Sequence, residues 1–260
     1  MPRSTYYYHC QRLEEDKYAE VLQQICTLHA AHKGRYGYRR ITCVLHQMGY
    51  TINHKTVLKL MRQQGLKSQR TRVRYRSYKG DVGRIAPNLL QREFTAQYPN
   101  QKWATDVTEF AVDGQKLYLS PIIDLYNGEV ISYAIARHPR FELVTQMLEK
   151  AFRKIDNKTG LLLHSDQGWQ YQMLQYRKLL ERKGIRQSMS RKANCLDNAM
   201  AENFFSILKS EMFYNQKFKS VEQLETQIQQ YINYYNNDRI KLKLKGLSPV
   251  KYRTQSSNSA

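Results

Sequence analysis

The feature that most constrains the fold is an aliphatic run that ends abruptly at an acidic turn, residues 161–168, LLLHSDQG. Leu161, Leu162 and Leu163 predict a short buried strand, and the polar residues after them predict a turn. Asp166 lies at the tip of that turn. We therefore expect a sheet with a carboxylate at the end of one of its inner strands.

Two further acids lie in comparable settings. Glu202 flanks the apolar stripe of a predicted helix, because Ala201, Phe205 and Leu208 recur at the spacing of one helix face. Asp106 lies in WATDVTEF, whose β-branched and apolar residues indicate a strand. Three carboxylates from two strands and a helix would form an oxygen-rich site for a hard cation such as Mg²⁺, which suits phosphodiester chemistry.

The spacing and surroundings of these acids resemble a known family. Asp106, Asp166 and Glu202, with 35 residues between the last two, resemble the D,D(35)E signature of transposases and retroviral integrases. The words WATDVT, HSDQG and DNAMAENFF are similar to those of bacterial insertion-sequence transposases with a retroviral-integrase-like core, made from a second reading frame. KGRYGYRRI and GLSPVKY also fit, so the resemblance covers nearly the whole chain.

The resemblance implies a fold and an activity. The expected fold is α/β, with a ribonuclease-H-like mixed five-stranded sheet flanked by helices and preceded by a small all-α helix-turn-helix domain. The expected activity is a DDE-type polynucleotidyl transferase that cleaves the ends of an insertion sequence and joins them to DNA by strand transfer. Asp106, Asp166 and Glu202 would be catalytic and would hold two Mg²⁺ (or Mn²⁺) ions. Asn198 is a candidate for orienting the acids from behind. His164 could do the same or could simply be a packed residue, and packing is the favoured interpretation.

The order of predicted elements agrees with that fold. Three strands at 102–110, 117–125 and 130–136 are separated by Asp113-Gly114 and Asn127-Gly128, which are strong hairpin signals. Helices at 141–155 and 173–183 then alternate with strands at 161–164 and 185–189. The predicted domains are a helical DNA-binding domain at 1–66, a basic linker at 67–100, the catalytic core at 101–215, and a helix with a basic tail at 216–260.

The amino-terminal region predicts three short helices, at 14–32, 38–48 and 54–65, with Asn53 as a helix cap. The last two helices, joined by a turn that contains glycine, resemble a helix-turn-helix. Lys55, Lys59 and Arg62 on the last helix would then contact DNA. The alternative is a small helical bundle whose charged residues only face solvent.

Further basic residues are candidates for phosphate contact. The linker contains four arginines that alternate with other residues: Arg70, Arg72, Arg74 and Arg76. In an extended chain their side chains would lie along one side, where they could contact phosphates. A solvated tether is the alternative for this segment. Lys209 shares a helix face with Glu202, which favours contact with a DNA phosphate over a merely solvated charge.

Charge and composition narrow the class of partner. The formal net charge is +20, which favours an anionic partner, and no apolar run approaches the roughly 20 residues of a membrane span. Nucleic acid is therefore the expected partner, not membrane. The four cysteines are scattered without a C-x-x-C pair, which predicts reduced thiols and no zinc site. We expect a cytoplasmic protein associated with the nucleoid.

The sequence leaves open how the protein assembles, and it allows two alternative functions. Joining both ends of an element in one complex implies a homo-oligomer on DNA, and the family implies fusion to, or partnership with, an upstream reading-frame product. A ribonuclease-H-like nuclease would cut DNA without joining it. A non-catalytic DNA-binding regulator would explain the charge but would leave the three acids without a role.

Overall fold

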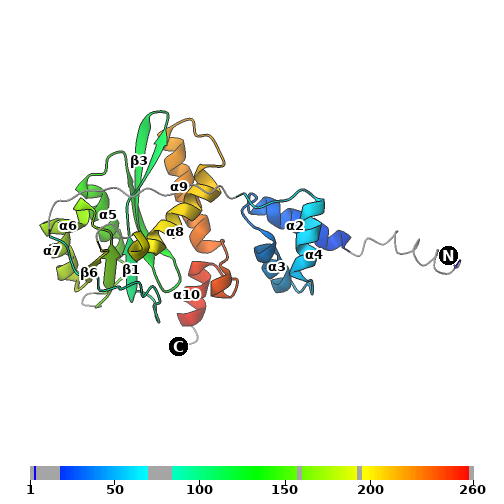
Figure 1. Ribbon diagram of the computed structural model, residues 1–260, viewed down its shortest axis with the longest axis horizontal. Coiled ribbons are helices and arrows are strands. Elements are labelled where there is room, and N and C mark those ends of the chain that lie inside the picture. Colours follow the sequence, from blue (N-terminus) through cyan, green and yellow to red (C-terminus); the bar gives the residue numbers. More distant parts are fainter. Residues whose placement is uncertain (1–2, 4–17, 70–83, 157–159, 192–194, 258–260) are drawn as a thin grey trace. The chain divides into compact units, whose positions relative to one another are not determined.

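The chain forms two compact units, Met1–Arg70 and Thr71–Ala260, which we describe separately (Figure 1). The computed structural model describes Arg3 and residues 18–69, 84–156, 160–191 and 195–257. Within those residues, no helix has the length and apolar character needed to cross a bilayer.

The first unit contains three packed helices, as predicted. Its helices are α2 (Ala19–Ala31), α3 (Tyr38–Gln47) and α4 (His54–Gln63). Their apolar stripes meet in a small core that includes Ile25, Ile41 and Val57, all fully buried. The Asn53 side chain accepts a hydrogen bond of 2.8 Å from the Lys55 backbone N–H, which confirms the predicted cap.

The second unit is built on one mixed sheet of six strands. They are β1 (Lys102–Thr105), β2 (Thr108–Val112), β3 (Gln115–Asp124), β4 (Val130–Ala136), β5 (Leu162–Ser165) and β6 (Arg186–Met189). The path runs β2-β3-β1-β5-β6, and β4 pairs with β3. Strands β1, β5 and β6 are parallel, whereas β2, β3 and β4 form the predicted antiparallel hairpins.

The sheet has six strands where the sequence predicted five, because the predicted strand at 102–110 is interrupted. Both pieces pair with the same edge of β3: β2 pairs with Gln115 to Leu119 and β1 with Ile122 to Asp124. Asp106 and Val107 stand between them, outside the ladder. The break turns Asp106 out of the regular strand.

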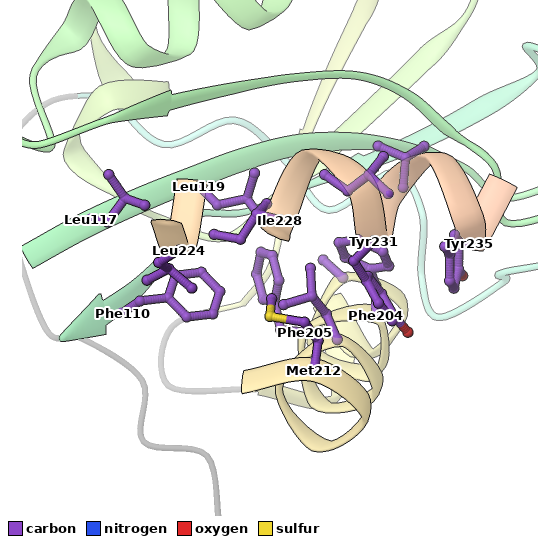
Figure 2. Close-up of a cluster of buried hydrophobic side chains, with 14 of the residues drawn as sticks. Phe110, Leu117, Leu119, Phe204, Phe205, Met212, Leu224, Ile228, Tyr231 and Tyr235 are labelled. Atoms are coloured by element: carbon purple, nitrogen blue, oxygen red, sulfur yellow. The ribbon is translucent and has the colours of Figure 1, made fainter. Parts of the chain in front are cut away.

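Helices cover both faces of the sheet (Figure 1). One face carries α5 (Phe141–Phe152), α6 (Trp169–Gln172) and α7 (Leu174–Lys183). The other carries α8 (Ala199–Leu208) and α9 (Val221–Asn237), with η1 (Cys195–Asn198), η2 (Lys209–Phe213), η3 (Leu242–Leu244) and α10 (Pro249–Ser257) completing the chain. Figure 2 shows the core of this second face, where Phe204 and Phe205 of α8 lie among Leu119 of β3 and Ile228 of α9. Residues from α9 thus share one core with the sheet.

Part of the predicted linker packs against this unit. Leu90 is buried with Ala104 and Leu162, and the backbone N–H groups of Leu89 and Leu90 both donate to Ser188 Oγ of β6, at 2.9 and 3.2 Å. The arginines predicted to track phosphates, Arg70, Arg72, Arg74 and Arg76, lie outside the described residues.

Candidate active site

The pairing of β1 with β5 brings two of the three acids together. These strands are parallel and adjacent, with Trp103 opposite Leu163 and Ala104 opposite His164. Asp106 and Asp166 follow at the same offset, just beyond the ends of the two strands. Because the carboxyl ends of parallel strands meet at one edge of a sheet, both carboxylates arrive at the same place.

Each of these acids is held by a backbone N–H close to it in sequence. Asp106 Oδ1 accepts a hydrogen bond of 2.7 Å from Val107, and Asp166 Oδ1 accepts one of 2.8 Å from Gly168. Such local bonds fix one oxygen of each carboxylate. Among the described residues no other hydrogen bond is made by these two carboxylates, so the second oxygens can serve a ligand.

Glu202 approaches the same edge from α8, on whose first turn it lies. Asn198 holds the beginning of that helix in place. Its Nδ2 donates a hydrogen bond of 3.1 Å to the backbone carbonyl of Thr105, the residue just before Asp106. Asn198 is one helical turn ahead of Glu202, so this bond ties the helix of the third acid to the strand of the first. The predicted role of Asn198 in orienting the acids stays a prediction, but its contacts suit that role.

Burial and mutual repulsion both act on the three carboxyl groups. Burial raises the pKa of Asp106 well above its usual value, and the negative charges of Asp166 and Glu202 raise it further. The pKa of Asp166 is raised by its burial, and that of Glu202 by partial burial and then by the charge of Asp166. Clustered acids with raised pKa values form a local excess of negative charge, which a cation would relieve.

The oxygen atoms of this site suit a divalent ion, although the three acidic side chains do not surround one common point. Within the described residues, no group of three acidic, histidine or cysteine side chains is close enough to hold one ion. Carboxylate oxygens are nevertheless the donors that Mg²⁺ and Mn²⁺ prefer. Nearby, the Asn198 Oδ1 atom and the hydroxyls of Tyr171 and Tyr176 are buried without a hydrogen-bond partner. Such orphaned polar atoms are typical of a site that holds water or an ion when loaded.

His164 is a packed residue, one of the two readings left open by the sequence. It is fully buried on β5, with Nδ1 2.8 Å from Ser188 Oγ and Nε2 3.1 Å from Ser190 Oγ. Burial lowers the pKa of the imidazole to about 4, so the ring is neutral at pH 7. It supports the strand that carries Asp166.

Lys209 reaches across the same face of the sheet. Its Nζ donates to the Glu109 carbonyl at 3.0 Å and lies over the Phe110 ring, 5.0 Å from the centroid. Its charge slightly lowers the pKa of Asp106, against the larger effects that raise it. Lys209 therefore already joins the end of α8 to β2.

In the first unit, Lys55, Lys59 and Arg62 are all exposed on α4. They lie opposite Val57 and Leu60, which are buried. The helix therefore presents a basic face to solvent, and its predicted contact with DNA stays a prediction.

The sequence reasoning overlooked Tyr171 and Tyr176. Both side chains are fully buried, and both lie close enough to Asp166 for its charge to raise their pKa values. No pattern in the sequence marks them, because their proximity to Asp166 depends on how α6 and α7 pack.

Comparisons with known proteins fit this geometry. Two family profiles described as integrase core domain match residues 96–195 and 202–256, and an HTH-like domain matches residues 15–74. InsK of Escherichia coli K12, described as a transposase for insertion sequence element IS150, is 54% identical over 98% of this chain and 90% of its own length. The chain belongs to the transposases of bacterial insertion sequences.

Another relative of this transposase, from insertion sequence element IS904 of Lactococcus lactis, is 35% identical over 92% of this chain and 95% of its own length. Among solved structures, the HTLV-2 integrase catalytic core in complex with magnesium is 16% identical, covers 60% of this chain and 98% of that one, and has a TM-score of 0.49. That likeness is too distant to carry an argument.

Membership in this family establishes the class of reaction. The transposase is a polynucleotidyl transferase with an integrase core, which cleaves DNA and transfers strands. Its HTH-like domain implies DNA binding. These findings favour neither the nuclease nor the non-catalytic regulator.

Proposed function

We propose that Asp106, Asp166 and Glu202 are the catalytic residues of this transposase and that together they hold two divalent ions, Mg²⁺ or Mn²⁺. The observation that carries the proposal is the parallel pairing of β1 with β5, which delivers Asp106 and Asp166 to one edge of the sheet. Glu202 joins them through the bond from Asn198 to Thr105, which anchors α8 to the end of β1.

Bound at these carboxylates, the ions would activate the attacking oxygen and neutralise charge on the phosphate and on the departing oxygen. The chain's own residues supply position and charge. Asp106 and Asp166 each keep one oxygen fixed by a backbone N–H, so their remaining oxygens are oriented before substrate arrives. Glu202 is half-buried on α8, and the negative charge of Asp166 adds to its partial burial in raising its pKa.

We also propose that Lys55, Lys59 and Arg62 bind the element's terminal DNA, supported by their common exposed face on α4. Lys209 and the linker residues Arg70, Arg72, Arg74 and Arg76 are proposed to contact phosphates near the site. The functional particle is proposed to be a homo-oligomer on DNA, and fusion to or partnership with an upstream reading-frame product remains part of the proposal. Its place in the cell is proposed to be the bacterial cytoplasm, on nucleoid DNA.

The proposal is tested with the purified full chain, labelled DNA carrying its element ends, and Mg²⁺. Asp106→Asn, Asp166→Asn and Glu202→Gln should each reduce both cleavage and strand transfer by about 10³-fold or more, because each removes a charged oxygen ligand. End binding, measured by fluorescence anisotropy without Mg²⁺, should be unchanged. Asp113→Asn is the matched control, since Asp113 is an exposed residue of the β2–β3 turn and should keep wild-type activity.

Full strand transfer by any of the three variants would remove that residue from the proposed centre. Cleavage that survives when joining is lost would instead assign the acid to strand transfer alone. A loss of end binding in Asp166→Asn would show that the substitution acts on the fold or on DNA contact, against the proposal.

A further inference from the structure

A fully buried carboxylate, that of Asp197, holds two arginines. Its Oδ1 accepts hydrogen bonds from Arg92 Nε at 2.8 Å and from Arg191 Nη2 at 3.0 Å. Its Oδ2 accepts from the Nε and the backbone N–H of Arg191, at 2.9 and 3.0 Å, and from Asn88 Nδ2 at 3.0 Å. The hydrogen bonds from Arg191 hold the pKa of Asp197 well below its usual value, so the carboxylate is charged at pH 7.

Arg191 leaves the sheet at the same edge as Asp166. Strand β6 is parallel and adjacent to β5, with Ser165 opposite Met189, so Asp166 and Ser190 are the next residues beyond the two strands. The Ser190 backbone N–H donates to the Ser165 carbonyl at 2.9 Å, which keeps the two chain segments together past the end of β5. Arg191 therefore follows directly on backbone that is bonded to the residue before Asp166.

The buried carboxylate is also tied to the strand of the other acid. Asn198 follows Asp197 in the chain, and its Nδ2 donates to the Thr105 carbonyl. Thr105 is the residue just before Asp106. Arg92 reaches Asp197 from 105 residues away in the chain, through the segment that packs on the sheet. Both arginines are thus held at the edge where Asp106 and its neighbouring acid lie.

The two arginines carry more charge and more N–H groups than Asp197 uses. Two guanidiniums against one carboxylate leave the cluster a net positive charge, and the Arg92 and Arg191 side chains are 44% and 58% exposed. Within the described part of the chain, neither guanidinium makes a hydrogen bond beyond those to Asp197. A guanidinium has more N–H donors than these bonds occupy. Each arginine therefore keeps donors for a ligand on a side chain that is already held in place.

A guanidinium fixed in this way suits a phosphate. Its planar N–H groups match two phosphate oxygens at once, and such charge-assisted bonds are stronger than neutral ones. Because Asp197 already orders both side chains, they lose less conformational freedom on binding than free arginines would. The acids at this edge repel a DNA phosphate, and positive charge beside them offsets part of that repulsion.

We infer that Arg92 and Arg191 bind a backbone phosphate of DNA next to the reacting phosphate, and so align the strand with the acids. This inference rests on the proposed catalytic role of Asp106 and Asp166, which places the reacting phosphate at this edge. The phosphate belongs to the element end or to the target DNA. Its chemistry is the same in both, and the experiment separates the two.

The test removes the charge of one phosphate at a time. Neutral methylphosphonate linkages replace, singly, the phosphates on either side of the reacting one, in element-end DNA and then in target DNA. End binding is measured by fluorescence anisotropy without Mg²⁺, and target binding as KM in strand transfer with Mg²⁺. The full-chain variants are Arg92→Gln, Arg191→Gln and Arg191→Lys. The matched control is Arg186→Gln, since Arg186 is exposed at the opposite end of β6.

For the wild-type chain, one neutral linkage in one of the two DNAs should weaken binding about 10-fold, the effect of losing a charge-assisted hydrogen bond. Arg92→Gln and Arg191→Gln should each weaken binding of unmodified DNA by a similar factor and lose most of the sensitivity to that linkage. Arg191→Lys should keep the sensitivity, because its charge remains. Arg186→Gln should match the wild-type chain.

An unchanged phosphate profile in both glutamine variants, with a lowered Tm, would overturn the inference by showing that the arginines only support Asp197. A wild-type chain indifferent to every neighbouring linkage would overturn it too, whether or not the variants fold. Equal losses in Arg186→Gln would show diffuse attraction in place of a phosphate site. Full strand transfer by Asp166→Asn would instead count against the proposed catalytic acids, with the metal-free phosphate profile unchanged.

Discussion

At the scale of single residues, the acidic site depends on space as much as on charge. Gly168 has φ −56° and ψ 141°, a backbone conformation open to any residue. Its importance lies in what surrounds it, since Asp166, Gln170 and Tyr171 all approach the position that a Cβ would occupy. The turn after β5 therefore presents a backbone N–H to Asp166, and a Cβ at Gly168 would require these neighbours to move by a few tenths of an ångström.

Gly168→Ala is expected to displace the Asp166 carboxylate, because the added Cβ would lie 3.0 Å from its Oδ1. Strand transfer should fall about 10- to 100-fold, the effect of misplacing a reacting group by a fraction of an ångström to one ångström. Stability should fall by only about 1 kcal/mol, as measured by urea denaturation. Gly37→Ala is the control, since its nearest contact is Ser68 Oγ at 3.4 Å. Equal activity of the two variants would contradict the prediction.

At the scale of elements, the carboxy-terminal segment is part of the catalytic unit's core. Arg239 lies in the segment predicted as a basic tail, yet it is buried. Its side chain is 4% exposed and binds both oxygens of Glu211 in η2, at 2.8 and 2.6 Å. Lys241 Nζ donates to the carbonyls of Asn127 and Gly128 in the β3–β4 turn. These two basic residues thus fasten the segment to η2 and to the β3–β4 turn of the sheet.

Arg239→Ala should lower the free energy of unfolding by about 3–5 kcal/mol, because it leaves Glu211 buried without its partner. Urea denaturation followed by circular dichroism gives the value. Lys243→Ala, from the same basic run but exposed, should change it by no more than about 0.5 kcal/mol. The double variant Arg239→Met, Glu211→Leu should recover most of the loss, since it removes both charges. Similar losses for Arg239→Ala and Lys243→Ala would show that the buried pair is not the cause.

At the scale of the whole molecule, charge and architecture are divided between two units. The net charge is +20, yet the edge of the sheet at the ends of β1 and β5 collects acids. The exposed basic face of α4 lies in the other unit, which has its own core. DNA binding and metal-dependent chemistry should therefore be separable by mutation.

Replacing Lys55, Lys59 and Arg62 together by alanine should weaken end binding and reduce the slope of log affinity against log salt by roughly 2 to 3, at about 0.9 per lost phosphate contact. Anisotropy titrations at several salt concentrations give the slope. The matched control is alanine at Lys178, Arg182 and Lys217, which are exposed in the catalytic unit. The same change in slope for both sets would show diffuse electrostatic binding instead of recognition through α4.

Much of the fold follows from the sequence alone, because periodicity and turn chemistry are local. The hairpins at Asp113-Gly114 and Asn127-Gly128, the Asn53 cap and the apolar face of α8 were all predicted from neighbouring residues, and the structure confirms them. The three acids were also chosen from sequence, from their strand and helix settings and from the family resemblance.

Only the tertiary structure decided the rest, since it depends on residues far apart in the chain. The break between β1 and β2 follows from pairing along β3, and the burial of Arg239 follows from Glu211 lying beneath it. The burial of Tyr171 comes from the way α6 packs against the sheet and α7. Local sequence specifies the elements, whereas the surroundings of a buried polar group are specified by whatever the fold brings against it.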